Sequence, residues 1–224
     1  MFARWSKMAK GFTKMGKEIA IAVKQGGPHP ENNPRLRMVI QNAKAINMPK
    51  DRIDAAIKRA SEKSAANFEE VVYEGYGPHG VAILVETATD NPTRTVANVR
   101  RYFTRGGGNL GTSGSLSFIF ERKGVFRISA EGQSLEDLEL ELIDAGLEEI
   151  EKDENEMVIY TQFSDFGAMQ KALEEKGIPV ISAEKQRIPN SFVELTEEQE
   201  AEIQKLVDEM EEDDDVQTVY TNMK

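Results

Sequence analysis

Histidine and cysteine, the side chains that most often carry nucleophilic or acid–base catalysis, are scarce in this chain. The sequence has no Cys, and its two histidines, His29 and His79, each stand in a turn rich in Pro and Gly. A general base needs a packed partner to orient it, which such turns seldom supply. Without Cys, a zinc site would need carboxylates, and these show no ligand spacing. The residues therefore predict a non-enzymatic protein with no metal and no cofactor.

Two short motifs invite a ligand-binding interpretation. Asp213-Asp214-Asp215 could hold a hard cation, but carboxylates at the end of an acidic helix are usually solvated, so we expect a frayed, exposed helix end. The run Gly106–Gly111 satisfies G-x-G-x-x-G by letter, yet it follows a predicted helix and precedes a predicted strand, the reverse of the dinucleotide-binding context. The loop, extended to Gly114, could present N–H groups to a phosphate, although a simple turn is favoured.

Four lysines fall on one side of the first predicted helix. At about 100° per residue they lie within about 80° of one another, and the apolar residues of the stretch cluster opposite them. The lysines are Lys7, Lys10, Lys14 and Lys17. We expect one side of this helix to pack and the other to present charge, although Gly11 and Gly16 each weaken it by about 1 kcal/mol relative to Ala.

Three arginines share one side of a later predicted helix. Arg94, Arg101 and Arg105 fall within about 40° of each other, opposite Val99 and Phe103. The apolar side can pack on a sheet while the guanidinium groups face outward beside the glycine loop. Arginine suits bidentate contact with phosphate or stacking on bases, although a solvated helix surface is the plain alternative.

The charges of the chain are segregated along its length. Residues 1–66 hold fourteen Lys or Arg against five Asp or Glu, whereas residues 67–224 hold fourteen against thirty-four, within a net charge of −11. Arg35 and Arg37 add to the lysines of this basic head. A basic end on an acidic chain suggests a surface for a polyanion, and a solvated helical face is equally compatible with charge alone.

The periodicity predicts an α+β protein of three domains. A basic helical domain of three helices spans 1–66. After Phe68 the pattern becomes strand-like, with a hairpin, a helix and a strand at Leu116–Phe120, and this first α+β part is resumed near the end of the chain. A discontinuous α+β domain is thus expected over 67–122 plus 189–224.

The third predicted domain, 123–188, is inserted in the discontinuous α+β domain. Its elements alternate as βαββαβ, the ferredoxin-like unit, and both α+β domains are expected to be ferredoxin-like. The tail contributes a strand at Phe192–Leu195, a helix from Thr196 and a final strand at Val216–Tyr220.

The cellular location is inferred from membrane-span and targeting signals in the sequence. No apolar run approaches the eighteen or so residues of a membrane span, and there is no signal-peptide core. An organelle transit peptide is disfavoured, because the N-terminal stretch has only Arg4 and Ser6 of the residue types that dominate such peptides. We therefore expect a cytoplasmic protein with no membrane partner.

Four blocks of residues, in order along the chain, resemble the signature of the YebC family. The blocks are Asn33-Pro34-Arg35-Leu36-Arg37, Tyr73-Glu74-Gly75-Tyr76-Gly77-Pro78 with Gly80, Asp90-Asn91 with Arg94-Thr95, and Gly107-Gly108-Asn109-Leu110-Gly111-Thr112 with Gly114-Ser115. The resemblance runs from Phe12 to about Tyr220. Typical members have a longer basic run before the counterpart of Phe12, so either a shorter arm or an upstream start is expected here.

The resemblance implies three domains, one inserted in another, in a cytoplasmic or mitochondrial protein. Members are described as DNA-binding transcriptional regulators or as translational activators, including factors that help ribosomes through proline runs. Phosphate contact dominates binding to DNA and to ribosomal RNA alike. No helix-turn-helix, zinc finger or basic zipper is recognisable and aromatics are few, which favours RNA or the ribosome, while the family description favours transcription. We predict a regulator of gene expression that binds nucleic acid and has no small-molecule substrate. The ligand is DNA or, alternatively, the ribosome.

Overall fold

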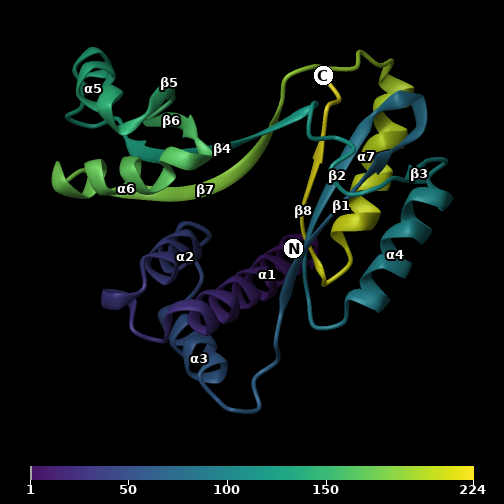
Figure 1. Ribbon diagram of the computed structural model, residues 1–224, viewed down its shortest axis with the longest axis horizontal. Helices are drawn as coiled ribbons and strands as arrows, with labels where there is room; N and C mark the ends of the chain where they lie inside the picture. Colours follow the sequence, from purple (N-terminus) through teal and green to yellow (C-terminus); the bar gives the residue numbers. More distant parts are fainter. Residues whose placement is uncertain (1) are drawn as a thin grey trace. The chain divides into compact units, whose positions relative to one another are not determined.

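The protein is described from a computed structural model, which gives the backbone of residues 2–224 and the side chains of residues 8–224 (Figure 1). The chain forms two compact units. Unit 1 comprises Met1–Leu36, Pro49–Glu121 and Pro189–Lys224, and unit 2 comprises Arg37–Met48 and Arg122–Ile188. No helix among the described residues is long and apolar enough to cross a membrane.

The helical part of unit 1 is built on α1 (Phe2–Gly26) and α3 (Lys50–Ala60), which pack against each other. Buried Ile19, Ala22 and Ile53 supply apolar contacts. Asn33, which is 3% exposed, donates its amide to the carbonyl oxygens of Ala22 and Gly27 at 2.8 Å and accepts from the backbone N–H of Leu36 at 3.0 Å. Asn33 is therefore the N-cap of α2 (Pro34–Ala45), with Pro34 at its first position.

Gly16, in the interior of α1, offers a simple test of helix propensity. A methyl group at this position would meet no atom within 4 Å. We expect Gly16→Ala to raise the free energy of unfolding by about 1 kcal/mol, measured by urea denaturation. Gly26→Ala is the matched control, because its Cβ would lie 2.7 Å from the Asn33 side chain. It should destabilise the protein; equal effects of the two changes would contradict the explanation.

Unit 1 also contains a four-stranded antiparallel sheet with the order β3-β1-β2-β8. Its strands are β1 (Glu69–Tyr76), β2 (Ala82–Thr89), β3 (Asn109–Leu110) and β8 (Val216–Thr221). The hairpin of β1 and β2, joined through the single turn η2 (Pro78–Gly80), occupies the centre. Helices α4 (Pro92–Arg105) and α7 (Glu197–Glu211) cover one face of the sheet, as Figure 1 shows.

Both faces of β2 are buried, which explains its unbroken apolar run. Ile83 and Val85 pack with Phe103 of α4 and Leu206 of α7, and Leu84 packs on the opposite face. The segment before β4 covers that opposite face with Leu116 and its neighbours. The α+β architecture predicted for this part of the chain is confirmed, with N-terminal helices and an antiparallel sheet.

The predicted strand Leu116–Phe120 is wrong. Residues 113–119 form turns, and the short strand that pairs with β1 is β3, inside the glycine loop. Leu116, Ile119 and Phe120 are buried at i, i+3 and i+4, the spacing of helical turns and not of a strand. The predicted strand Phe192–Leu195 is reduced to one bridge between Val193 and Met223.

Unit 2 has the predicted βαββαβ order. Its elements are β4 (Phe120–Ser129), α5 (Leu135–Leu142), η3 (Ile143–Ala145), β5 (Leu147–Asp153), β6 (Glu156–Gln162), η4 (Phe163–Asp165), α6 (Phe166–Glu175) and β7 (Val180–Pro189). The sheet order β5-β6-β4-β7 places the first and third strands of the motif at the centre, as in ferredoxin-like folds. Phe126 and Ile159 of the sheet pack with Leu142 of α5 and Met169 of α6.

Most of α2 is grouped with unit 2, although the sequence placed it in the helical head. The Asn42 amide donates to the carbonyl oxygen of Ala183 and accepts from its N–H, both at 2.9 Å. Gln41 donates to the carbonyl oxygen of Val180. These side chains satisfy backbone groups on β7, which is an edge strand, while Met38 packs on the core of unit 2.

Candidate nucleic-acid interface

The predicted lysine side of α1 is engaged within unit 1. Lys10 forms an ion pair with Glu212, and Lys14 Nζ donates to the carbonyl oxygen of Gln217 at 3.2 Å. Burial lowers the pKa of Lys14, with nearby carboxylates opposing the shift. The side chain of Lys7 lies outside the described residues.

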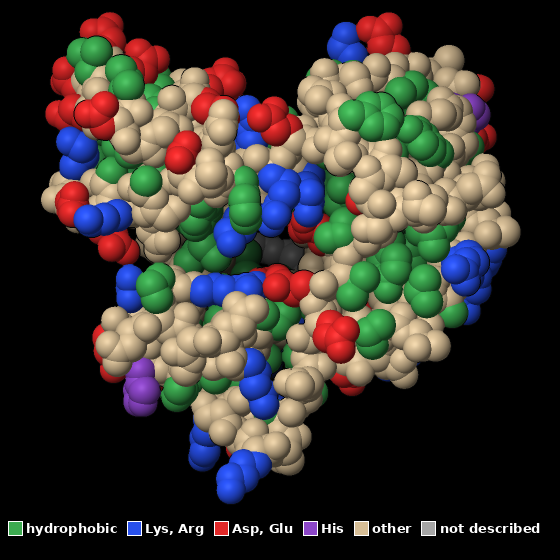
Figure 2. Space-filling model, viewed as in Figure 1, with side chains coloured by type: hydrophobic (Ala, Val, Ile, Leu, Met, Phe, Trp, Pro, Cys, Tyr) green, Lys and Arg blue, Asp and Glu red, His purple; other side chains and the backbone are tan. Residues whose placement is uncertain are grey.

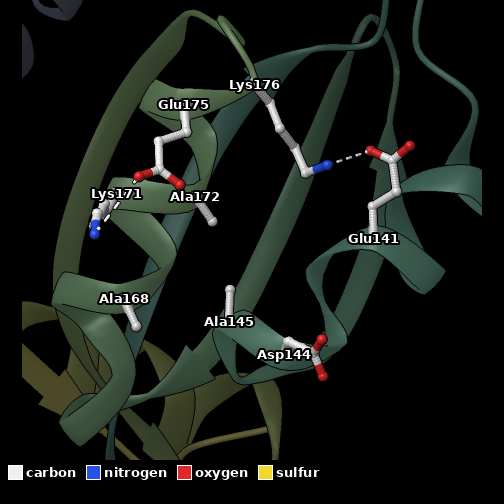
Figure 3. Close-up of a pocket in the computed structure, with 8 residues that line it drawn as sticks. All are labelled: Glu141, Asp144, Ala145, Ala168, Lys171, Ala172, Glu175 and Lys176. Carbon is white, nitrogen blue, oxygen red and sulfur yellow. Dashed lines mark hydrogen bonds and ion pairs between the residues drawn. The ribbon is translucent and has the colours of Figure 1, made fainter.

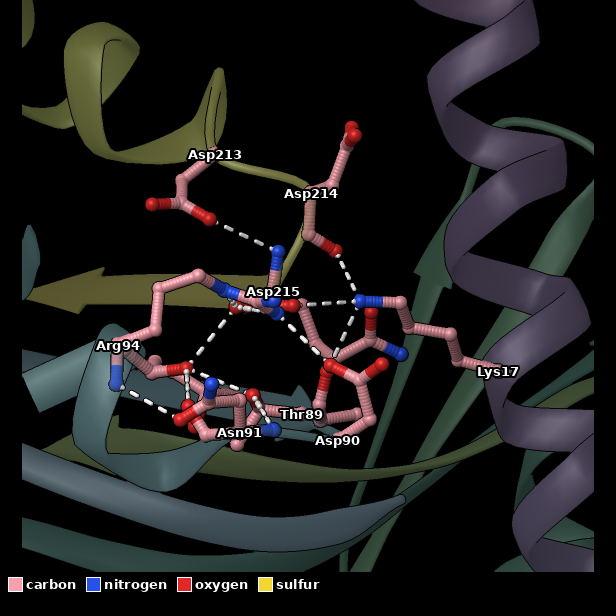
Figure 4. Close-up of polar contacts among 12 residues, drawn as sticks. Lys17, Thr89, Asp90, Asn91, Arg94, Asp213, Asp214 and Asp215 are labelled. Atoms are coloured by element: carbon pink, nitrogen blue, oxygen red, sulfur yellow. Dashed lines mark hydrogen bonds and ion pairs between the residues drawn. The ribbon is translucent and has the colours of Figure 1, made fainter. Parts of the chain in front are cut away.

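Lys17 is held most firmly of these lysines. Its ammonium group donates to the carbonyl oxygens of Ala88 at 3.0 Å and Asp214 at 2.6 Å, and to the carboxylate of Asp215 at 3.0 Å (Figure 4). Its side chain is 11% exposed. The expectation that this side of α1 presents its charge to solvent is therefore wrong for Lys17, because the turn before β8 supplies compensating oxygen atoms.

Asp215 joins α1, α4 and the turn between α7 and β8. Besides Lys17, it accepts hydrogen bonds from Arg94 Nη2 at 2.7 Å and from Thr95 Oγ1 at 2.9 Å (Figure 4). Burial alone would raise the pKa of this carboxyl group, but the hydrogen bonds from Arg94, Lys17 and Thr95 outweigh it and hold the pKa below its ordinary value. Asp215 is 4% exposed.

Asp213 is also tied into the structure. Its carboxylate accepts hydrogen bonds from the Asn98 amide and the Tyr102 hydroxyl, both at 3.0 Å, and from the backbone N–H of Asp215 at 2.9 Å. The prediction of a frayed, solvated acidic end is therefore wrong for Asp213 and Asp215. These two carboxylates instead have structural partners. Among the described residues, no cluster of three or more His, Asp or Glu is placed to hold a metal ion.

Arg35 and Arg37 each have a carboxylate neighbour. Arg35 donates to Glu70 at 2.7 Å and to the Gln25 amide oxygen at 2.7 Å. Arg37 Nη2 lies 3.9 Å from Glu174 in unit 2. The two arginines therefore serve different units, although they are two residues apart.

Helix α4 has the two-sided character that the sequence predicts. Asn91 caps it by accepting from the N–H of Arg94 at 3.1 Å, and Pro92 occupies the first position. Val99 and Phe103 are fully buried against the sheet, so the arginines stand on the other side.

The three predicted arginines of α4 differ in their surroundings. Arg94 is 48% exposed, but it is bound to Asp90 and to the buried Asp215. Arg105 is 66% exposed and lies 3.3 Å from the carboxylate of Glu209. Arg101 is exposed and lies over the Tyr102 ring, 5.4 Å from its centre. The sequence analysis omitted Arg100, which is also exposed and whose place beside Arg101 was the available signal.

The glycine loop is packed, and its N–H groups are largely used within the protein. A Cβ on Gly108 would lie 2.2 Å from the carbonyl oxygen of Tyr76, so only glycine permits this approach to β1. The Glu74 carboxylate accepts from the N–H groups of Gly114 at 2.9 Å and Leu116 at 2.6 Å. The protein's own carboxylate thus occupies the position of an anion, which supports the turn interpretation over phosphate binding.

Glu74 provides a test of that arrangement. It is 8% exposed, and Glu74→Gln replaces one of its two accepting oxygens with a donor that faces a backbone N–H. We expect the free energy of unfolding to fall by about 1.5–3 kcal/mol, measured by urea denaturation. Glu69→Gln, at an exposed position on the same strand, should change it by less than about 0.5 kcal/mol. Equal losses would show that the buried hydrogen bonds are unimportant.

The two histidines differ in their surroundings. His29 lies 3.6 Å from Glu31, and both side chains are exposed. His79 Nε2 lies 2.6 Å from the Glu202 carboxylate of α7, and its Nδ1 lies 3.3 Å from the Gln199 amide. The expectation that neither histidine has an orienting partner is therefore wrong for His79, whose contacts connect the turn η2 with α7.

Fold and site together define a mixed α+β protein with an N-terminal helical part and an arginine-bearing helix laid on an antiparallel sheet. The chain belongs to the TACO1/YebC family. Residues 1–63 match the family profile described as the TACO1/YebC protein N-terminal domain, and residues 68–223 match the TACO1/YebC second and third domain. The resemblance stated from the four sequence blocks is therefore confirmed.

Curated bacterial relatives are similar over nearly the whole chain. One from Parabacteroides distasonis is 59% identical over 100% of this chain and 92% of its own length, and one from Cytophaga hutchinsonii is 63% identical over 98% and 92%. Both are named probable transcriptional regulatory proteins. A crystal structure of a conserved hypothetical protein from Aquifex aeolicus is similar with a TM-score of 0.80 and 43% identity, covering 96% of this chain and 90% of that one.

Proposed function

We propose that the protein is a non-enzymatic regulator of gene expression that binds nucleic acid through phosphate contacts. The observation that carries this proposal is the exposed side of α4. Its fourteen residues include four arginines and no Asp or Glu, and Arg100, Arg101 and Arg105 are exposed while the opposite side is buried. In a chain of net charge −11, such a side offers a local positive surface.

The contacts of these arginines are compatible with a ligand. An ion pair between exposed groups, such as Arg105 with Glu209, contributes at most about 1 kcal/mol, so a phosphate can replace the carboxylate at little cost. Guanidinium groups also bind phosphate in a bidentate manner. The proposal leaves out Lys17 and Arg94, because both are bound to Asp215. The other predicted contacts of the helical head remain predictions: Lys7, Lys10, Lys14, Arg35 and Arg37.

DNA is the first candidate ligand, because the curated relatives are named as probable transcriptional regulators. Ribosomal RNA is the second, and the position of α4 in the chain favours it. This helix lies between strands β2 and β3, so it is not the second helix of a helix-turn-helix motif. As part of the proposal, the protein acts in the cytoplasm and takes no small-molecule substrate.

The test is a comparison of the two ligands with the full chain. Binding to duplex DNA is followed by fluorescence anisotropy, and binding to ribosomes by co-sedimentation, each between about 50 and 200 mM salt. We expect the logarithm of the association constant to fall linearly with the logarithm of the salt concentration for the physiological ligand. Absence of binding to both ligands at the lowest salt concentration would contradict the proposal.

A further inference from the structure

The exposed side of α5 and η3 in unit 2 carries large apolar side chains. Leu140 is 73% exposed and Ile143 is 59% exposed. They are three residues apart, so in a helical segment they lie one above the other on the same side. Isolated exposed apolar residues are common, but two that adjoin form a continuous apolar surface.

A hollow of about 480 Å³ adjoins this apolar pair. Ala145, Ala168 and Ala172 line it from η3 and α6. Figure 3 shows these short side chains together with the longer ones that line the hollow, which are Glu141, Asp144, Lys171, Glu175 and Lys176. Glu141 and Asp144 directly follow Leu140 and Ile143, so the apolar pair and the hollow are adjoining strips of one surface. Small side chains allow a group from a partner to approach closely.

The charge around this surface is uniformly negative on α5 and η3. Residues 135–145 include five carboxylates and no Lys or Arg, and all five are exposed. The carboxylates are Glu136, Asp137, Glu139, Glu141 and Asp144. Figure 2 shows Asp, Glu and hydrophobic side chains gathered where α5 lies. Lys171 and Lys176 also line the hollow, but each faces a carboxylate, Glu175 at 3.5 Å and Glu141 at 2.7 Å. The carboxylates of the surface still outnumber its cations, so nucleic acid and anionic lipid would be repelled and a cationic partner attracted.

We propose that the α5–η3 surface docks an amphipathic helix of a partner protein that carries Lys and Arg beside its apolar side. Leu140 and Ile143 contact the apolar side, the hollow takes one protruding side chain, and the carboxylates other than Glu141, which is bound to Lys176, pair with the cations. Charge complementarity selects this occupant. The surface is on unit 2 and is distinct in charge from the arginines of α4, so the protein has one surface for a polyanion and another for a basic protein.

The test uses the full chain and synthetic peptides of about 18 residues, five helical turns. The first peptide is an amphipathic Leu/Lys helix, the second has Glu in place of Lys, and the third is a scrambled Leu/Lys sequence. Binding is measured by titration with amide chemical shifts. We expect saturable binding of the first peptide, with shifts on α5, η3 and α6, weaker binding at high salt, and no binding of the other two.

The variant Leu140→Ser/Ile143→Ser should weaken binding of the first peptide about tenfold or more. Phe192→Ser is the matched control, because it removes an apolar side chain that is 57% exposed on unit 1, and it should bind like the unchanged protein. Equal binding by the double variant, equal binding of the scrambled peptide, or shifts on unit 1 would overturn the proposal. So would self-association of the unchanged protein that the double variant abolishes in sedimentation, because the occupant would then be a second copy.

Discussion

Asp215→Asn should lower the free energy of unfolding by about 3 kcal/mol or more. The change leaves the ammonium group of Lys17, only 11% exposed, without its charged partner, and breaking a buried ion pair in this way typically costs about 3–5 kcal/mol. It also turns an amide NH₂ toward donors such as Arg94 and Thr95. Urea denaturation measures the change.

Asp214→Asn is the control for this prediction. Asp214 is exposed, and it contributes its backbone oxygen, not its carboxylate, to the Lys17 contact. The free energy of unfolding should therefore change by less than about 0.5 kcal/mol. Similar losses in the two variants would show that the acidic turn acts only through its overall charge.

The same interaction predicts a dependence on pH. The folded-state pKa of Asp215 lies below its value in the unfolded chain, so the unfolded state takes up the proton first as the pH falls. The stabilisation is present above the ordinary Asp pKa of about 3.9 and is lost as the pH falls through the folded-state value. The difference in stability between Asp215→Asn and the unchanged protein should accordingly shrink below about pH 4. A difference that stays constant to lower pH would contradict this assignment.

Apolar spacing predicted the helices and strands well where only one side of the element packs on a hydrophobic core. The βαββαβ order of unit 2 and the buried side of α4 follow from apolar spacing, because Val99 and Phe103 pack on a sheet adjacent in the chain. The apolar spacing at Leu116–Phe120 predicted a strand, but three buried residues there cover a sheet face from a turn. Burial alone does not distinguish a strand from a packed turn.

Charge patterns predicted the exposed residues less reliably than apolar spacing predicted the elements. One charged residue in the sequence does not indicate whether a distant residue of opposite charge will pair with it. Lys17 and Asp215 are 198 residues apart, and each was interpreted alone as a solvated charge. The contacts of α2 within unit 2 could not be predicted for a similar reason. The polar side of that helix includes Asn42, whose partner Ala183 lies 141 residues away on an edge strand. Such contacts depend on the tertiary arrangement and leave no local signal.

Arg101→Glu/Arg105→Glu should weaken nucleic-acid binding about tenfold or more at physiological salt and leave stability nearly unchanged. Each reversal removes a phosphate contact and adds repulsion, and the salt dependence should become shallower by about one unit of slope for each lost contact. Both side chains are exposed, so each change should alter the free energy of unfolding by less than about 0.5 kcal/mol. Anisotropy and co-sedimentation report binding, and urea denaturation reports stability.

Lys152→Glu/Lys171→Glu is the matched control, because it makes the same change in net charge at exposed positions of unit 2. If binding falls equally in both double variants, overall charge and not the α4 surface determines affinity. Arg94 is left out of the test because it binds Asp215, so its reversal would disturb the fold. If binding with its full salt dependence survives the loss of Arg101 and Arg105, the phosphate contacts must lie elsewhere. The exposed cations of α3, including Lys58 and Arg59, would then be the next residues to reverse.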